Sequence, residues 1–308
     1  MGIVNCQTQE KLNPLSSKIF KIRKVNNENE SNQNSKFSIF IYDVENKKGT
    51  ENPLELRIFQ SMEGLTDLKV NNAYYLCGNP KPEDIGSSFF IRIEHTKKPI
   101  TSSILISTIN HHYYPAMIGV KNTQILVIGG KGQKSCECYS IVSEKWKQLP
   151  NLPDERYKCS LCFDKQNEDV YLFGGYNGER KKMSQTILRI HTKYYIQWDT
   201  IMLKEDNRQY IERLSPCLWV KDNGTICILG GKNQEDQNIN TLVEINIKKK
   251  NCKLIRELND NVSIEYSTFE ESGNYFYFFD NSFNIRRINK ESGEIGELSF
   301  DNVFQSIE

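Results

Sequence analysis

The run Ile125-Leu126-Val127-Ile128-Gly129-Gly130 decides the fold of this chain, because its glycine pair recurs behind two further apolar runs. Those runs end in Gly174-Gly175 and Gly230-Gly231, so the three pairs begin 45 and 56 residues apart. A glycine pair that closes a buried strand indicates a tight turn and a close backbone approach, where a Cβ atom would clash or strain φ. The chain is therefore built from repeats of one strand-containing unit.

A second pattern follows the first glycine pair. Tyr139 and Trp146, separated by six residues, fit two strands joined by a tight hairpin, and their side chains would cover the space between adjacent sheets. A period of about 50 residues is typical of β-propellers. The apolar strand with Gly-Gly, followed by Tyr-x6-Trp, resembles the kelch motif, and this resemblance implies a propeller of four-stranded blades.

Weaker copies of the hairpin pattern set the number of blades. Ile190 and Trp198 are eight positions apart, which predicts a longer turn or a bulge. The remaining pairs keep the seven-residue offset: Tyr42 and Gly49, Ile93 and Ile100, Ile245 and Cys252, and Ile288 and Ile295. The six copies predict an all-β, kelch-type propeller of six four-stranded blades, with five and seven blades as alternatives.

The two ends of the chain suggest how the ring closes. The first copy contains predicted strands at 18–22, 37–44 and 54–60 but lacks an inner strand, whereas the segment 302–307 is a strand without a copy of its own. We expect this C-terminal strand to become the inner strand of the first blade, because an open ring would leave an exposed strand edge.

The predicted organisation is a single propeller domain over residues 18–308, preceded by a tail over 1–17 and interrupted by a polar loop over 25–36. The tail resembles an N-myristoylation signal, except that Cys6 stands where Ser or Thr is usual. An unmodified tail and a tail acylated at Gly2 and Cys6 are both open. Only the acylated tail would give a membrane anchor.

Composition argues against a protein drawn to nucleic acid or membranes by its overall charge, and it indicates a reducing compartment. The formal net charge is +1 and 26% of the residues are charged, so no overall field draws the chain to nucleic acid or to an anionic membrane. The nine cysteines are odd in number and most lie in apolar strand-like runs, which is typical of a reducing compartment. We expect a cytoplasmic, monomeric propeller.

Basic residues precede three of the predicted inner strands. Arg156 and Arg213 lie 18 and 17 residues ahead of their glycine pairs, and His111 lies 18 residues ahead of the first pair. The kelch pattern also places a basic residue here, and we expect each side chain to bond turn carbonyls on the next blade. Contact with a ligand is the alternative, and His112 is expected in a loop or groove.

Two cysteine pairs and one histidine pair suggest metal ligands. Cys136-x-Cys138 and Cys159-x-x-Cys162 have spacings found in zinc sites, and the run 111–114 is His-His-Tyr-Tyr, the ligand types of a copper enzyme with kelch repeats. Adjacent residues in a strand face opposite ways, as do residues three apart, so we expect neither group to converge on one ion. Buried thiols, with no metal and no cofactor, are the prediction.

No motif for nucleophilic, phosphate-binding or zinc-protease chemistry occurs in the sequence. The resemblance implies a non-catalytic protein-binding scaffold with a cytoskeletal or complex-assembly role. A kelch-type enzyme or small-molecule binder acting at the central mouth of the propeller is the alternative.

The partner would bind on one face of the ring. In a four-stranded blade, the loop from the second to the third strand and the connection to the next blade emerge on the same face. Both are long here and carry aromatic and basic side chains, which are enriched in interface hot spots. The predicted partner-binding residues are Tyr157, Tyr176, Arg180, Lys181, Arg208 and Tyr210.

Overall fold

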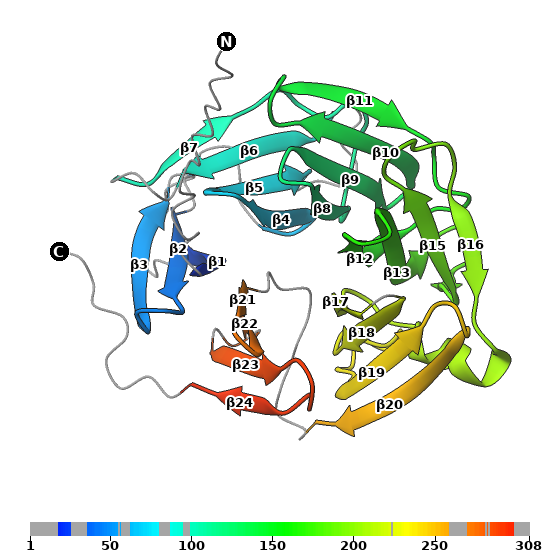
Figure 1. Cartoon of the computed structure of the whole chain (residues 1–308). Helices are drawn as coiled ribbons and strands as arrows, with labels where there is room; N and C mark the ends of the chain where they lie inside the picture. The colour runs from blue at the N-terminus through cyan, green and yellow to red at the C-terminus, as the bar shows by residue number, and fades with distance from the viewer. Residues whose placement is uncertain are drawn as a thin grey trace, which may run out of the picture.

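The computed structural model describes residues 18–25, 36–54, 56, 62–79, 87–94, 99–222, 224–258, 270–280, 282 and 284–298. Over these residues the strands form six antiparallel sheets arranged in a ring (Figure 1). The prediction of an all-β, six-bladed propeller is therefore confirmed. Among the described residues, no helix has the length and apolar character needed to cross a membrane.

We number the blades in chain order. Blade 1 contains β1 (Lys18–Val25), β2 (Lys36–Asp43) and β3 (Lys48–Leu54). Blade 2 contains β4 (Leu65–Val70), β5 (Ala73–Gly78), β6 (Phe89–Glu94) and β7 (Thr101–Ile104). Blade 3 contains β8 (Ala116–Val120), β9 (Gln124–Gly130), β10 (Gln133–Ser140) and β11 (Lys145–Leu149).

Blade 4 contains β12 (Tyr157–Asp164), β13 (Asp169–Asn177), β15 (Thr186–His191) and β16 (Asp199–Met202), with the short β14 (Lys182–Met183) paired to β13. Blade 5 contains β17 (Cys217–Asp222), β18 (Thr225–Leu229), β19 (Thr241–Asn246) and β20 (Asn251–Glu257). Blade 6 contains β21 (Glu270–Ser272), β22 (Tyr275–Phe279), β23 (Ile285–Asn289) and β24 (Ile295–Glu297). The 3₁₀ helix η1 (Glu205–Tyr210) connects blades 4 and 5.

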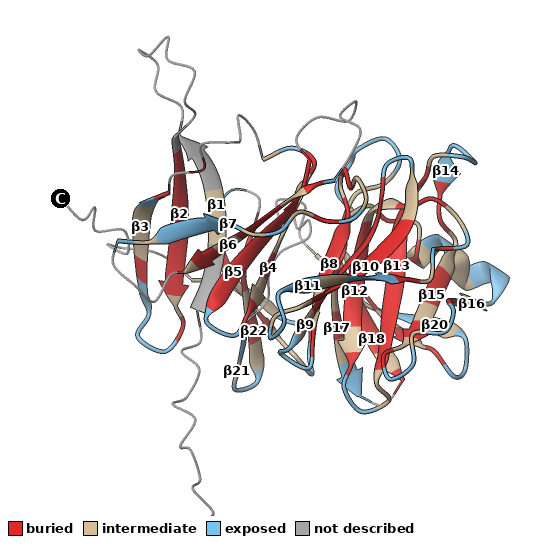
Figure 2. Cartoon of the chain, turned by 90° about the horizontal axis from the view of Figure 1, so that it is seen from above, coloured by how far each residue is buried: buried red, intermediate tan, exposed pale blue. Residues whose placement is uncertain are grey.

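The hydrophobic core consists of six clusters, and each lies between two neighbouring blades. This arrangement explains why the strand before the first glycine pair is a continuous apolar run. Ile125 and Val127 pack toward blade 2, whereas Leu126 and Ile128 pack toward blade 4, so both faces of β9 are buried (Figure 2).

Blades 6 and 1 also share a core cluster, which completes the ring within the described residues. It includes Phe40 and Tyr42 of blade 1 with Phe279 and Ile285 of blade 6. The Lys21 ammonium adds a hydrogen bond to the main-chain oxygen of Asp280 at 2.6 Å. The predicted closing strand at 302–307 lies outside the described residues, as do the tail at 1–17 and positions 26–35 of the polar loop.

Most of the predicted outer hairpins have the expected register. Direct Cα partners are Tyr42 and Gly49, Tyr139 and Trp146, Ile245 and Cys252, and Ile288 and Ile295. In blade 4, Arg189 pairs with Asp199 without a shift in register, so the extra residue before Trp198 lengthens the turn rather than forming a bulge.

Two predicted strand positions are wrong. Ile93 pairs with Ser102 rather than with Ile100, because the connection in blade 2 is two residues longer than the pattern assumes. In blade 1 the strand that pairs with β2 is Lys48–Leu54, which begins six residues earlier than predicted because a short turn after Asp43 returns the chain at once; positions 57–60 of the predicted strand lie outside the described residues. Four of its seven residues are polar and only Leu54 has a large apolar side chain, so a search for apolar runs passed over this strand.

Neighbouring blades approach each other closely at the glycine pairs. Gly129 has φ +66°, and a Cβ there would lie 2.5 Å from the carbonyl oxygen of Arg156 in the next blade. Gly174 has φ +63°, and its Cβ would overlap the carbonyl oxygen of Arg213. Both the backbone conformation and the space therefore require glycine.

Replacing Gly174 with alanine should lower the free energy of unfolding by about 3 kcal/mol, since left-handed strain is added to the displacement of Arg213. Gly273 is a matched control, because it also has positive φ (+55°) but nothing within 4 Å of a built Cβ. Gly273→Ala should cost only about 1 kcal/mol. Urea unfolding of both variants measures the difference, and equal losses would contradict the close-approach argument.

Candidate functional site

An inner collar of main-chain hydrogen bonds joins the starts of the inner strands of blades 2 to 5. It consists of Gly64, Tyr114, Lys158 and Ser215, and each amide donates to the carbonyl of the preceding member: Tyr114 to Gly64 (2.9 Å), Lys158 to Tyr114 (3.2 Å) and Ser215 to Lys158 (2.7 Å). All four have positive φ, between 48° and 77°. For the three non-glycine residues this conformation costs about 1 kcal/mol each, and such strain clusters at binding sites.

A cavity of 250 Å³ lies at the centre of this collar, and we call it the central mouth. Its walls come from the inner strands of blades 2, 3, 4 and 5 and from the residues that precede them. The lining residues are Leu65, Thr66, Asp67, Tyr114, Pro115, Lys158, Cys159 and Ser215.

The central mouth carries aromatic and basic groups. Tyr113 and Tyr114 both donate to Oε1 of Glu63 at 3.1 Å, and their rings lie 4.6 Å apart. The Lys158 ammonium lies 4.8 Å from the centre of the Tyr114 ring, at a cation–π distance. Burial and the neighbouring Tyr113 and Glu63 raise the pKa of Tyr114, so its hydroxyl remains protonated. The mouth thus offers a cation and hydroxyl groups.

Four of the six predicted partner-binding residues lie on one part of blade 4, where Tyr157 adjoins Lys158 of the central mouth. Tyr157 and Tyr176 are direct partners on β12 and β13, and their half-buried rings are 5.5 Å apart. Burial and the neighbouring Tyr176 raise the pKa of Tyr157. The β13–β14 hairpin continues from Tyr176 and presents Arg180 and Lys181 to solvent.

The other two predicted residues, Arg208 and Tyr210, lie elsewhere. They belong to η1, which lies at the outer edge of the ring between β16 and β20 (Figure 1). Asn207 fixes this helix by accepting the amide of Cys252 at 2.8 Å. Tyr210 packs against the core between blades 4 and 5. The connection from blade 4 to blade 5 therefore covers the outer strand instead of projecting beside Tyr176, and the structure does not bring all six residues together.

Buried basic side chains precede the inner strands of blades 4 and 5, as predicted, but their contacts differ. Arg156 donates to the carbonyl of Thr186 at 2.8 Å, and Arg213 donates to the carbonyl of Thr241 at 3.1 Å. Each arginine also reaches the threonine hydroxyl. Both threonines begin the third strand of the same blade, so the prediction of side-chain bonds to the next blade is wrong. The guanidinium instead crosses the strand ends of its own sheet.

The main chain at these positions makes the link between blades. In each bond, an amide at the glycine turn of one blade donates to the carbonyl of the bracing residue of the following blade. The bonds are Asn79 to His112 (2.9 Å), Gly130 to Arg156 (2.8 Å) and Gly175 to Arg213 (2.8 Å). His112, and not the predicted His111, therefore holds the bracing position of blade 3. The distance to the glycine pair varies by one residue between blades, and this variation misplaced the prediction.

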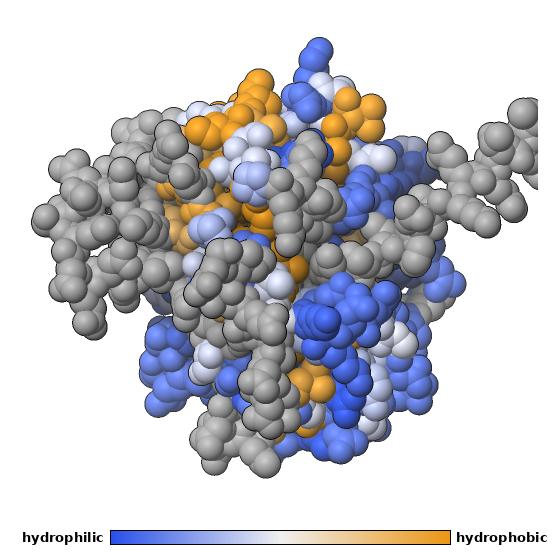
Figure 3. Space-filling view, turned by 90° about the vertical axis from the view of Figure 1, so that its left-hand side faces the viewer, coloured by the Kyte–Doolittle hydropathy of each residue, from blue (hydrophilic) through white to orange (hydrophobic). Residues whose placement is uncertain are grey.

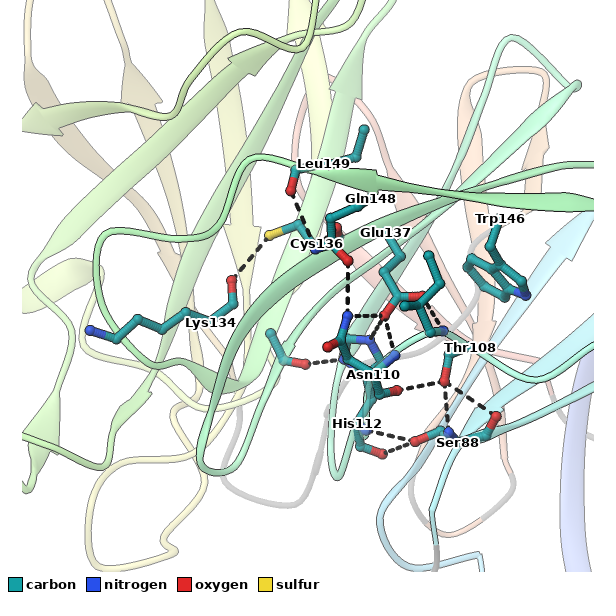
Figure 4. A network of polar contacts seen from close by, with 12 residues as sticks. Ser88, Thr108, Asn110, His112, Lys134, Cys136, Glu137, Trp146, Gln148 and Leu149 are labelled. Carbon is teal, nitrogen blue, oxygen red and sulfur yellow. Dashed lines mark hydrogen bonds and ion pairs between the residues drawn. The ribbon is translucent and has the colours of Figure 1, made fainter. Parts of the chain in front are cut away.

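In blade 3 a buried ion pair replaces the arginine and threonine. Both side chains are fully buried: His112 contacts the carbonyl of Gly129 through Nδ1 at 2.5 Å and Glu137 through Nε2 at 3.1 Å (Figure 4). Glu137 also accepts the amides of Ile109 and Asn110, each at 2.7 Å. Burial acts to raise the pKa of Glu137, but the hydrogen bond and charge of His112, with these donors, hold it below its usual value.

Trp146 and Trp198 fasten the outer parts of neighbouring blades. Trp146 Nε1 donates to the carbonyl of Ile106 at 2.9 Å, and Trp198 Nε1 donates to that of Pro150 at 3.0 Å. Each acceptor lies in the connection that leads from the preceding blade into the blade of the tryptophan. Phe90 packs against both Tyr139 and Trp146, so these aromatic groups fill the space between blades 2 and 3.

Cys159 and Cys162 do not converge, whereas Cys136 and Cys138 both lie in the core between blades 3 and 4. Cys159 belongs to the core between blades 3 and 4, whereas Cys162 belongs to the core between blades 4 and 5. Burial raises the pKa of both Cys136 and Cys159 to about 12, so these thiols stay protonated. Among the described residues, no group of three or more His, Cys, Asp and Glu side chains is placed to hold a metal ion.

An exposed apolar strip lies at the outer edge of blade 2, away from the central mouth. Ile104 is 62% exposed and Ile106 is 60% exposed, on β7 and directly after it. Figure 3 shows apolar surface on the upper part of this side, where β7 lies in Figure 1. This strip is separate from the four clustered candidate residues.

The inner collar was not predicted, although the sequence contains a signal for it. Three of the four collar residues stand two positions after the bracing residue of their blade: Tyr114 after His112, Lys158 after Arg156 and Ser215 after Arg213. The residue types at this position differ between blades, so a search for repeated residues could not find it. Main-chain conformation, rather than side-chain identity, is what the blades share here.

The fold defines the chain as a six-bladed β-propeller whose central mouth is joined to an aromatic and basic surface on blades 3 and 4. No protein-family model matches the sequence.

Proposed function

We propose that this propeller is a kelch-type, non-catalytic scaffold that binds a protein partner on the face carrying the central mouth. The observation that carries the proposal is the Tyr157–Tyr176 pair, half-buried beside the mouth with Arg180 and Lys181 exposed next to it. Tyrosine and arginine dominate interface hot spots, since they bury large areas and still form hydrogen bonds.

The rigidity of the face also supports binding. The inner collar and the amide-to-carbonyl links hold blades 2 to 5 together around the mouth. A surface that is already ordered loses little conformational entropy when a partner binds. The resemblance to kelch repeats rests on the glycine pairs, on Tyr139 with Trp146 and on the basic bracing residues, and it favours a cytoskeletal or complex-assembly role. The pattern of the cysteines favours a cytoplasmic location, and we expect a monomer.

The test compares partner capture by three proteins in native extract: the unchanged chain, a Tyr157→Ala/Tyr176→Ala variant and a Tyr194→Ala control. Tyr194 is 59% exposed, on the β15–β16 turn of blade 4. We expect a specific set of proteins to be lost only with the double variant, provided that its melting temperature is close to that of the control. Equal capture by all three would refute binding through this face.

The central mouth supports a second candidate, a kelch-type enzyme or small-molecule binder. Its specific observation is the 250 Å³ cavity lined by the strained collar residues Tyr114, Lys158 and Ser215. A screen of metabolites by thermal shift tests this candidate, with Lys158→Met as the comparison. A compound that stabilises the unchanged chain but not the variant would favour it over the scaffold.

A further inference from the structure

Exposed basic side chains gather on two neighbouring loops of the proposed binding face. One loop is the β9–β10 turn of blade 3 and the other is the β13–β14 hairpin of blade 4. We call these side chains the basic rim, and they are Lys131, Arg180, Lys181 and Lys182.

The acidic groups nearest to these loops are already used within the protein. Glu155 accepts the amide of Gly132 at 2.5 Å. Glu179 forms an ion pair with Lys134 at 2.8 Å, and Asp154 forms one with the buried Arg156 at 3.0 Å. None of the four basic-rim side chains forms an ion pair with another described residue. Four cations thus stand against one nearby carboxylate that forms no ion pair among the described residues, that of Glu155, so the surface carries a net positive charge although the whole chain has a net charge of only +1.

The hairpin that carries three of these cations is held in a fixed position. Asn177 is only 2% exposed, and its Oδ1 accepts the amide of Arg180 at 2.8 Å. Ser184 closes the base of the hairpin by donating its amide to the carbonyl of Gly175 at 2.9 Å. Glu155 also lies against Gly178, where there is no room for a Cβ. The charges thus project from an ordered support.

We infer that the partner presents an acidic peptide segment, whose carboxylates face the basic rim while an apolar or aromatic side chain packs on the Tyr157–Tyr176 pair. This inference rests on the proposed function and adds the chemistry of the partner. Charge complementarity of this kind sets specificity and the rate of association. The rim spans two loops, which is short for the basic track that a nucleic acid requires.

The experiment selects binders from a library of short random displayed peptides on the immobilised protein, and then measures the affinity of one enriched peptide. We expect enriched sequences to contain several Asp or Glu residues. The affinity for that peptide should fall by about tenfold or more in the variant Arg180→Glu/Lys181→Glu/Lys182→Glu. Added salt should lower the affinity of the unchanged chain for the same peptide. The matched control reverses three exposed lysines on the β19–β20 turn of blade 5, as Lys248→Glu/Lys249→Glu/Lys250→Glu, and should leave the affinity within about twofold.

The outcomes separate this inference from the proposed function. One outcome is that the enriched peptides lack acidic residues and no longer bind Tyr157→Ala/Tyr176→Ala but still bind the charge-reversal variant. This outcome would support the binding face and refute the acidic partner. No enrichment at all would count against both. Tighter binding of a single-stranded oligothymidylate than of any acidic peptide would replace the protein partner with nucleic acid. Lys131→Glu, on the other loop, gives an independent check of the charge effect.

Discussion

Replacing Arg213 with methionine should lower the free energy of unfolding by about 3 kcal/mol, although methionine preserves most of the side-chain volume. Arg213 is 2% exposed and donates to the carbonyls of Tyr210, Gly230 and Thr241. It also donates to the Thr241 hydroxyl at 2.8 Å. Methionine offers no donor, so these buried oxygens would lose their partner. Chemical denaturation at neutral pH measures the loss.

Arg189 in blade 4 is the matched control for this substitution. Its side chain is 40% exposed and pairs with Asp199 on the neighbouring strand at 2.7 Å. An exposed ion pair contributes little, so Arg189→Met should cost only about 0.5 kcal/mol. The variant Thr241→Val removes one of the four acceptors and should fall between the two, at about 1 kcal/mol. If Arg213→Met cost no more than Arg189→Met, the bracing role would be refuted.

The features predicted well from the sequence are those that depend on apolar pattern and on glycine. A strand buried on both faces must be apolar at every position, and a close approach between blades must be glycine, so Ile125 to Gly130 reveal both at once. The hairpin offset of Tyr139 and Trp146 is set by the turn length, which is why it recurs in blades with different residues. Pattern alone was sufficient for the number of blades.

The features predicted poorly depend on the path of irregular segments. The connection that contains Arg208 and Tyr210 has no periodicity, and its route to the outer strand is decided by contacts such as that of Asn207 with Cys252. The prediction named His111 instead of His112 as the bracing residue of blade 3 for a similar reason. The spacing of residues in the sequence does not reveal a one-residue difference in loop length. That difference decides whether the ring of His111 or of His112 is buried beside Glu137.

The bracing position in blade 3 differs from the others because it contains a buried carboxylate, that of Glu137. A carbonyl oxygen and an ionised carboxylate can only accept hydrogen bonds, so both ring nitrogens of His112 donate, one to Gly129 and one to Glu137. The resulting imidazolium stands where blades 4 and 5 have Arg156 and Arg213. Blade 3 therefore depends on Glu137 to compensate a buried cation.

Glu137→Gln should accordingly lower the free energy of unfolding by about 3 kcal/mol at pH 7, because it leaves the buried His112 without its counter-charge. The exposed Glu257 is the matched control, and Glu257→Gln should change the free energy by no more than about 0.5 kcal/mol. Urea unfolding at fixed pH gives both values. A loss at Glu137 as small as that at Glu257 would show that the buried pair contributes no net stability.

The pH dependence of the same two variants gives the sign of the effect. The pKa of Glu137 in the folded protein lies below its usual value of 4.5. The stabilisation by Glu137 is therefore fully present above about pH 4.5 and is lost as the pH falls through the lower, folded value. The unchanged chain and Glu257→Gln should lose stability steeply in that acid range, whereas Glu137→Gln should lose less. If all three curves ran parallel below pH 4.5, the carboxylate of Glu137 would not be the group that responds to acid.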